Sequence, residues 1–553
     1  MDSKKLTIFV LISVVLMFGW QTLMDRFYPE RSAQRLAASA PASVSASNPV
    51  ATASGVASGT LDAGLLQRGQ RITVKTDVFS AEIDSNGADL RSVNLLKHGE
   101  SDNPQTPFPL LTDAPGHIYV AQTGLLGDGL PTHKSEFKAA QQSYKLADGQ
   151  NELAVRLEAA GPEGVKVAKT YVFKRGSYLV DVKYEIINGS AKPITASAYY
   201  RFLRDDSKQA TGRMGTNTFT GPAVYTDEGK FQKIDFAKLA ENKATYVEKA
   251  KDGWVAMLQH YFATAWIVSP TGGESICGAQ ACRYDLKKLP DGLFSAGVIA
   301  DLPQVAAGGK LETSIPLFLG PEDTRILKPI APGLNLVKDY GWVTIIATPL
   351  FWLLEKLHSI VGNWGWAIIL LTMLIKAAFF PLSAASYRSM AKMRVLAPRM
   401  AALKERYGDD RMKLQQAMMA MYKEEKVNPL GGCLPMLIQI PVFIALYWTL
   451  LASVEIRQAP WLGWIVDLSS KDPYYILPVL MTISMYVQSL LSPPPPDPMQ
   501  AKIMKIMPLA FSVMFFMFPA GLVLYWVVNN SLSILQQWVI TRQIERSNKI
   551  AKA

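Results

Sequence analysis

The distribution of apolar residues divides this 553-residue chain into parts that require different solvents. An uncharged run from Leu6 to Met24 is followed by about 320 predominantly polar residues, and long apolar stretches resume near Trp342. Uncharged apolar runs of this length are typical of helices that cross a bilayer, where the backbone must satisfy its own hydrogen bonds. The sequence therefore predicts a membrane protein with a large water-exposed domain inserted after its first membrane segment.

The first apolar run indicates an N-terminal anchor. Lys4 and Lys5 precede it, and the positive-inside rule keeps such a flank in the cytoplasm. A cleaved signal peptide is the alternative, but the run is long and the first Ala-Ser-Ala sequence comes only at 38–40. We expect residues 1–25 to form an uncleaved anchor. Residues 26–60 are rich in Ala, Ser and Pro without large apolar groups and predict a flexible tether.

The polar segment 61–335 has the pattern of an all-β domain. Short β-rich runs such as ITVKTDVFSAEI and YLVDVKYEII end at the turn sequences Asp84-Ser85-Asn86-Gly87 and Asn188-Gly189. This predicts a large antiparallel β-sandwich on the periplasmic side. No paired catalytic carboxylates occur in a recognisable motif, so a scaffold is expected, with a sugar- or peptide-binding receptor domain as the alternative.

The cysteines and histidines limit the chemistry of the chain. Cys277 and Cys282 lie on the proposed exported side and are close enough in sequence to form a disulfide, whereas Cys433 begins a membrane span. The five His are scattered and no close Cys/His set occurs, so neither a metal site nor a cofactor is expected.

Charge predicts the topology of the second half. Residues 336–362 combine a short apolar run with Glu355, Lys356 and His358 and predict an interfacial amphipathic helix. Five spans are expected within 363–545, at about 363–382, 431–451, 474–490, 506–519 and 521–540.

The loops between these spans differ in their basic residues. Segment 383–430 carries ten Lys/Arg against five Asp/Glu, and the tail 546–553 is also basic. Six spans with both termini in the cytoplasm satisfy the positive-inside rule. The net charge of +11 is therefore assigned to membrane orientation, and DNA is not an expected partner.

Segment 383–430 predicts a cytoplasmic helical hairpin. Helices are expected at 384–407 and 411–426, joined by the turn Gly408-Asp409-Asp410. One side is rich in Met, which suits either packing within the hairpin or contact with varied apolar partners. Its basic residues suit ribosomal RNA or anionic lipid as well as topology alone.

Lys376 is the only charge between His358 and Arg388. A Lys at the centre of a span costs roughly 2.5 to 3.5 kcal/mol on insertion scales, so such residues mostly face protein, water or a partner. Snorkelling to the headgroups is the alternative. Thr372 lies one helical turn before Lys376 on the same face.

Polar and aromatic residues in other spans extend this theme. Interhelical hydrogen bonding is the simpler explanation for any one of these amides, but with Lys376 the set predicts a hydrated cavity. The candidate residues are Thr372, Lys376, Gln439, Gln488, Tyr525, Trp526, Asn529, Ser533 and Gln536.

Known catalytic motifs are absent from the sequence. It contains no GxxxxGK[ST] phosphate loop, HExxH zinc motif or GxSxG nucleophile elbow, so an enzyme is not expected. A transporter or channel for a small solute remains the alternative from another class, although paired intramembrane charges and inverted repeats are not evident.

Several segments closely resemble the YidC membrane protein insertases. They are SMAKMR (389–394), EKVNPLGGCLPMLIQIPVF (425–443), RQAPW (457–461), DPYYILPVLM (472–481), DPMQAKIMKIMP (497–508) and FPAGLVLYWVVNN (518–530). The resemblance is strong over about 340–545, and the anchor, tether and exported β-domain resemble the Gram-negative form of the family.

The resemblance implies a five-helix insertase core around a hydrophilic groove that is open to the cytoplasm and to lipid. Lys376 stands where the family usually has Arg, Thr372 matches a groove threonine, and Trp526 stands where Tyr is common. The implied function is insertion and folding of inner-membrane proteins, alone or with the Sec translocon. The implied partners are nascent membrane proteins, Sec components, the ribosome and lipid, with the chain active as a monomer.

Overall fold

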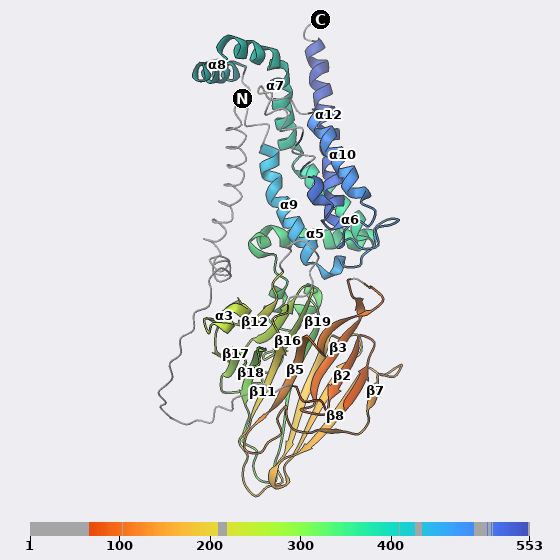
Figure 1. Ribbon diagram of the computed structural model, residues 1–553, viewed down its shortest axis with the longest axis vertical. Coiled ribbons are helices and arrows are strands. Elements are labelled where there is room, and N and C mark those ends of the chain that lie inside the picture. Colours follow the sequence, from red (N-terminus) through yellow and green to blue (C-terminus); the bar gives the residue numbers. More distant parts are fainter. Residues whose placement is uncertain are drawn as a thin grey trace. The chain divides into compact units, whose positions relative to one another are not determined.

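The computed structural model describes residues 66–101, 103–207, 218–408, 410–425, 434–491 and 512–550, with residues 506 and 510. The described residues belong to one compact unit. The predicted anchor and tether lie outside the described residues, as do Cys433 and residues 507–509 and 511 of the span predicted at 506–519. Figure 1 shows strands, coloured red to green, followed along the chain by the helices from α5 onward, coloured green to blue.

The β-domain is a sandwich of two sheets, as the sequence predicts. One sheet has the order β14-β17-β18-β11-β5-β4-β3-β2-β1-β7 and the other has the order β13-β12-β15-β16-β19-β10-β9-β8-β6. Neighbouring strands are antiparallel except β1 and β7, which are parallel. The strands are β1 (Arg71–Lys75), β2 (Phe79–Asp84), β3 (Asp89–Gly99), β4 (Pro107–Ala114), β5 (His117–Leu126), β6 (Lys138–Ala139), β7 (Ser143–Lys145), β8 (Glu152–Ala160), β9 (Lys166–Lys174), β10 (Leu179–Ile187), β11 (Ser197–Arg204), β12 (Gly221–Thr226), β13 (Lys230–Lys233), β14 (Lys249–Ala250), β15 (Trp254–Gln259), β16 (Phe262–Ile267), β17 (Cys282–Lys288), β18 (Phe294–Asp301) and β19 (Lys310–Pro321). The short helices of this domain are α3 (Phe236–Ala240) and α4 (Thr324–Leu327).

Alternation of side chains builds the sandwich core. Along β10, Val180, Val182, Tyr184 and Ile186 are buried while the residues between them are more exposed, because successive side chains in a strand point to opposite faces. The run ITVKTDVFSAEI contains two strands rather than one. The Thr76 hydroxyl accepts hydrogen bonds from the backbone N–H groups of Val78 and Phe79, at 3.2 and 2.9 Å. This turn folds β2 back onto β1.

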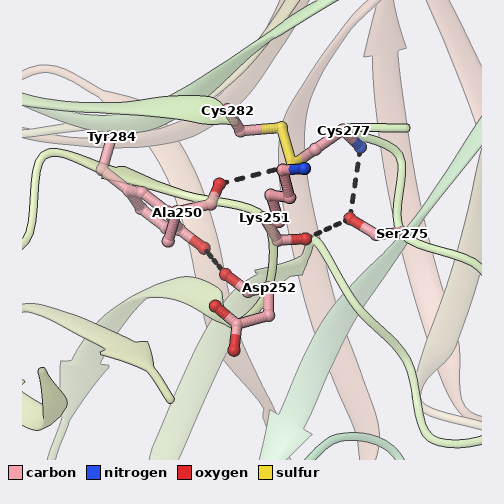
Figure 2. Close-up of a disulfide and its surroundings, with 7 residues drawn as sticks. All are labelled: Ala250, Lys251, Asp252, Ser275, Cys277, Cys282 and Tyr284. Carbon is pink, nitrogen blue, oxygen red and sulfur yellow. Dashed lines mark hydrogen bonds between the residues drawn. A yellow bond between two sulfur atoms is a disulfide. The ribbon is translucent and has the colours of Figure 1, made fainter. Parts of the chain in front are cut away.

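A disulfide joins Cys277 to Cys282 beside the edge strand β14 (Figure 2). Both cysteines are buried, and their Cα atoms are 5.2 Å apart. The Cys277 backbone N–H donates to Ser275 Oγ, which in turn donates to the Lys251 carbonyl at 2.6 Å. The disulfide therefore fixes a loop that is also hydrogen-bonded to the chain next to β14.

We predict that replacing both cysteines, in Cys277→Ser with Cys282→Ser, lowers the free energy of unfolding of the β-domain by about 2 kcal/mol, because closing a loop of this size restricts the unfolded chain. Thermal unfolding of the full-length protein in detergent measures the change. Adding a reductant to the wild type should reproduce it and should leave the double variant unaffected. Equal unfolding temperatures for all samples would contradict the prediction.

Three half-buried histidines make the β-domain sensitive to acid. Burial lowers the pKa of His98 and of His260 from 6.5 to about 4, and the nearby Arg457 adds to both shifts. Burial, with the charge of Arg201, lowers the pKa of His133 to about 3. Between pH 6.5 and these values the unfolded chain binds more protons than the folded one, so the free energy of unfolding falls as the pH falls.

We predict a loss of up to about 1.4 kcal/mol per pH unit for each of the three histidines as the pH drops from 6.5 toward 4. The unfolding temperature of the full chain, followed by near-ultraviolet circular dichroism across this range, tests it. His133→Asn removes one titrating group and should make the pH dependence less steep. A flat profile between pH 6.5 and 4 would rule out the linkage.

The second half of the described chain is helical. Its helices are α5 (Thr344–Val361), α6 (Trp364–Ala378), α7 (Phe380–Tyr407), α8 (Arg411–Glu424), α9 (Leu434–Ala452), α10 (Ile476–Leu491) and α12 (Ala520–Ile550). Residues of α5, α6, α9, α10 and α12 share one apolar core. Helices α7 and α8 form the predicted hairpin, and Figure 1 shows α8 lying across the end of α7.

The predicted number of membrane spans is not confirmed by the described helices. By length and composition, α5 alone is able to cross a membrane, and the bent pair Trp364–Ala378 with Phe380–Met393 passes the same test when taken together. The apolar helices Gln439–Ala452 and Ile476–Leu491 are shorter. The interfacial placement of 336–362 stays a prediction.

The apolar stretch predicted to be one span at 363–382 is broken. Asn363 caps the start of helix α6, where its side chain accepts hydrogen bonds from the N–H groups of Gly365 and Trp366, and the helix ends at Ala378. The chain then bends by 65° into α7. Pro381 accounts for the break, since proline has no N–H to donate and its ring clashes with the carbonyl four residues earlier. The bend leaves Lys376 in the last turn of α6.

Candidate functional site

Lys376 is half-buried in the helical core, where its ammonium meets helix α12. Its Nζ donates to Ser533 Oγ at 2.7 Å, and Ser533 Oγ donates to the Asn529 carbonyl at 2.8 Å. Among the described residues Lys376 has no acidic partner within salt-bridge distance. Its place in the last turn of α6 is favourable, because a cation is stabilised at the negative end of the helix dipole.

A pocket opens beside this cation. It contains about 370 Å³ of space, part of it open to solvent, and its walls come from the α6–α7 bend, α9 and α12. Gln439 on α9 donates its amide hydrogen to Asn529 Oδ1 on α12 across the pocket. The lining residues are Ile375, Lys376, Phe379, Leu382, Ser383, Gln439, Val442 and Asn529.

Four of the predicted site residues therefore meet: Lys376, Gln439, Asn529 and Ser533. Five residues that were not predicted from the sequence line the same pocket: Ile375, Phe379, Leu382, Ser383 and Val442. The signal that could have found Phe379, Leu382 and Ser383 is Pro381, because a break at this point turns the start of α7 toward the end of α6.

The remaining predicted residues have other surroundings. The Thr372 hydroxyl is buried and donates to the Ile368 carbonyl of its own helix at 2.7 Å. Tyr525 and Trp526 pack on Phe443, with ring centroids 6.5 and 4.4 Å away.

The two glutamines differ as well. Gln536 reaches the Phe380 carbonyl at 3.5 Å, beside the bend. Gln488 is half-buried on α10 and is not among the described residues that line the pocket.

A second polar row on α12 holds helices together. Asn530 donates to Ser484 Oγ at 3.3 Å, and Gln537 donates to the Leu491 carbonyl at 3.0 Å. Both contacts join α12 to α10. The polar residues of α12 thus divide between the pocket and interhelical hydrogen bonds, the simpler of the two explanations that the sequence allows.

The methionines of the hairpin divide in a similar way. Met421 is buried, and Tyr422 donates a hydrogen bond to Met400 Sδ at 3.6 Å between α8 and α7. Met412 and Met419 are exposed, and they lie seven residues apart on α8. Packing explains the first group, whereas the second presents an apolar surface.

The β-domain contains a Ser, a His and an Asp side chain in contact, but not as a catalytic relay. Ser207 Oγ and Asp205 both contact Nδ1 of His117, at 2.7 and 3.2 Å. A relay needs the carboxylate on one ring nitrogen and the hydroxyl on the other. Within the described chain no three His, Cys, Asp or Glu side chains are arranged to hold a metal ion.

Taken together, these features describe a two-part membrane protein, a β-sandwich joined to an apolar helical core that holds polar side chains and a cation. Comparisons with known proteins agree with this class. Residues 71–353 match the family model of the YidC periplasmic domain, and residues 356–548 match that of the 60Kd inner membrane protein.

Curated relatives match over the whole length. The chain is 57% identical to the membrane protein insertase YidC of Laribacter hongkongensis, with all of both chains covered. It is 52% identical to that of Dechloromonas aromatica, covering 100% of this chain and 99% of the relative. A crystal structure of an active YidC insertase aligns with a TM-score of 0.41 and 19% identity, covering 85% of this chain and 92% of the other.

The chain belongs to the YidC family of membrane protein insertases. Family membership assigns it to the bacterial inner membrane and makes the β-sandwich its periplasmic domain. The family name describes insertion of polypeptides rather than enzymatic catalysis.

Proposed function

We propose that the pocket around Lys376 is the centre of a hydrophilic groove that binds nascent inner-membrane proteins and releases them into lipid. One observation carries the proposal. A half-buried ammonium lies in an apolar core, and its hydrogen-bond partner is the neutral hydroxyl of Ser533. The charge is therefore available to an anionic group from another chain, and Gln439 and Asn529 add hydrogen-bonding groups beside it.

The groove would act by lowering the cost of moving polar groups into the membrane. Burying an amide without a hydrogen bond costs roughly 2 to 7 kcal/mol, so a client's polar N-terminal tail needs partners on its way across. A client carboxylate 4 Å from the ammonium gains about 4 kcal/mol at an effective dielectric constant of 20. The apolar client segment then leaves for lipid, which favours it by about 25 cal/mol per Å² of apolar surface removed from water. No nucleotide is needed for these steps.

Having Lys rather than Arg at this position changes what the site offers. An ammonium is a compact charge with three donors, whereas a guanidinium presents a planar fork that fits a carboxylate with two parallel hydrogen bonds. We expect Lys376 to attract acidic client groups without fixing their orientation. A groove that holds passing polypeptides of many sequences requires no fixed orientation.

The remaining parts of the proposal concern topology and partners. We infer six spans with both termini in the cytoplasm, because the basic residues of 383–430 and 546–553 then lie inside. The hairpin and the basic tail would meet the translating ribosome or anionic lipid. The chain would work as a monomer, alone or beside the Sec translocon, with the β-domain as a scaffold.

The charge of Lys376 gives the first test. We expect Lys376→Glu to slow insertion of an acidic-tailed, Sec-independent client by about tenfold, equivalent to about 1.4 kcal/mol, and to affect a client with a neutral tail much less. Lys376→Ala should have an intermediate effect and Lys376→Arg a small one. Protease protection of the client's tail in a host depleted of its own insertase measures the rate.

Lys392→Glu is the matched control, because Lys392 is exposed on α7 outside the pocket. Insertion of the acidic-tailed client at wild-type rates by both Lys376→Ala and Lys376→Glu would refute the step in which charge attracts the client.

Photocrosslinking gives the second test. A photoreactive residue at 376 or 439, both in the pocket wall, should crosslink to a short client during its synthesis. The same residue at 372, where the native hydroxyl is bonded within its own helix, should crosslink less, and position 526 reports whether the groove extends past the packed aromatic rings. Absence of client crosslinks from all four positions would exclude the groove.

A further inference from the structure

The loop after α9 is packed into both parts of the described chain. Its short 3-10 helix, Val454–Ile456, places Val454 in the apolar core of the β-sandwich and Ile456 in the apolar core of the helices. Both side chains are buried. Two residues that are separated by only one position therefore pack into two different apolar cores. The loop is held by the β-sandwich and by the helices at once.

A buried ion pair fixes the residue between them. Lys338 Nζ lies 2.8 Å from both carboxylate oxygens of Glu455, and the two side chains are only 1% and 4% exposed. The same ammonium lies 3.7 Å from the ring centre of Phe351 on α5. Lys338 follows the end of the β-domain, so one side chain connects that end, α5 and the loop after α9. Removing either charge would leave the other buried without compensation.

The next two residues attach the loop to the β-domain itself. Gln458 uses both ends of its amide, with Nε2 donating to the carbonyls of Gly99 and Glu100 at 3.2 and 3.0 Å and Oε1 accepting from the Gly99 N–H at 3.3 Å. The Arg457 guanidinium lies 5.6 to 5.8 Å from the ring centres of three aromatic residues, a cation–π arrangement. These rings belong to Phe108, Tyr261 and Phe262.

Helix α9 connects this fixed loop to the pocket. Gln439, which bonds Asn529, precedes Ala452 at the end of α9 by thirteen residues, about 20 Å along the helix. The helix runs without interruption to Ala452, and Ser453 Oγ then donates to the Thr449 carbonyl at 2.5 Å. Glu455 therefore lies just beyond the end of the helix whose other part carries Gln439 in the pocket wall.

We propose that Lys338 and Glu455 are positioning residues that hold α9, and with it Gln439, in register against α12. This inference rests on the proposed function for its importance to insertion, but its geometry is testable without any client.

The test measures the α9–α12 contact directly. In a full-length Cys433→Ser background, the pair Gln439→Cys with Asn529→Cys is treated with a short thiol crosslinker. Adding Lys338→Met should lower the crosslink yield at least threefold, whereas Lys338→Arg should keep it near the reference. Exchanging the charges, in Lys338→Glu with Glu455→Lys, should restore most of the yield lost in Lys338→Met.

Two controls separate positioning from general loosening. Ser484→Cys with Asn530→Cys reports the α10–α12 contact, which does not involve α9. Its yield should not change in Lys338→Met. Lys328→Met removes an exposed lysine near the end of the β-domain and should change neither yield.

The outcomes distinguish this proposal from the groove. An unchanged Gln439–Asn529 yield in Lys338→Met, or an equal fall in both crosslinks, would overturn the positioning role. If Lys338→Met fails to fold, Glu455→Gln, which keeps the volume and an acceptor for Lys338, decides by the same two yields. A selective loss of the α9–α12 crosslink without any change in client insertion would support the positioning role and count against the groove.

Discussion

A charge inside an apolar helical core must be solvated by something, and in this protein helix α12 provides the partner. Lys376 reaches Ser533, and the neighbouring turn of α12 presents Asn529 to Gln439 on α9. Each contact involves a different pair of helices, so the polar groups determine how α6, α9 and α12 meet. The apolar side chains around them fill space but specify the arrangement less strictly, because hydrophobic contact is non-directional. The pocket is a consequence of satisfying these polar groups.

The periplasmic domain is held together by different interactions from those of the helical core. Strand alternation and aromatic packing account for its core, and its buried polar groups bond both to one another, as Gln122 does to Asp89, and to the backbone. Lys169 is an example, since its ammonium donates to the carbonyls of Gly87 and Ala88 at 2.7 and 3.0 Å. Such contacts tie the two sheets together without forming a site. The loop after α9 contacts this part of the protein in two places. Its Glu455 pairs with Lys338, and its Arg457 lies among aromatic rings of the β-domain.

The sequence predicts the features of this fold that depend on periodicity or on one residue type. The sandwich, the hairpin of α7 and α8 and the presence of a cation among apolar residues all follow from such local patterns. The sequence does not predict which side chains reach the pocket, because that depends on three-dimensional packing. Thr372 and Lys376 share a helix face, yet the Thr372 hydroxyl bonds to its own backbone and leaves the pocket to Lys376. Asn529 and Asn530 are the same residue type at adjacent positions. Only their contacts show that Asn529 faces the pocket and Asn530 faces α10. In the sequence, Pro381 indicates a break, but only the packing of α6 against α7 brings Leu382 and Ser383 to the pocket.

The bend at Phe379 also determines how far different parts of α7 would move if the helix rotated about it. Helix α7 starts at the pocket wall and continues away from it into the hairpin. One helix therefore carries both the pocket wall and the first half of the hairpin. Ser383 lies four residues from the bend, about 6 Å along the helix, while Ala397, just before Pro398, lies eighteen residues or about 27 Å away. A rotation about the bend therefore displaces the wall by less than a quarter of the distance that the far segment travels. For any rotation of α7 about this bend, the change in the width of the pocket is therefore only a fraction of the movement of the hairpin.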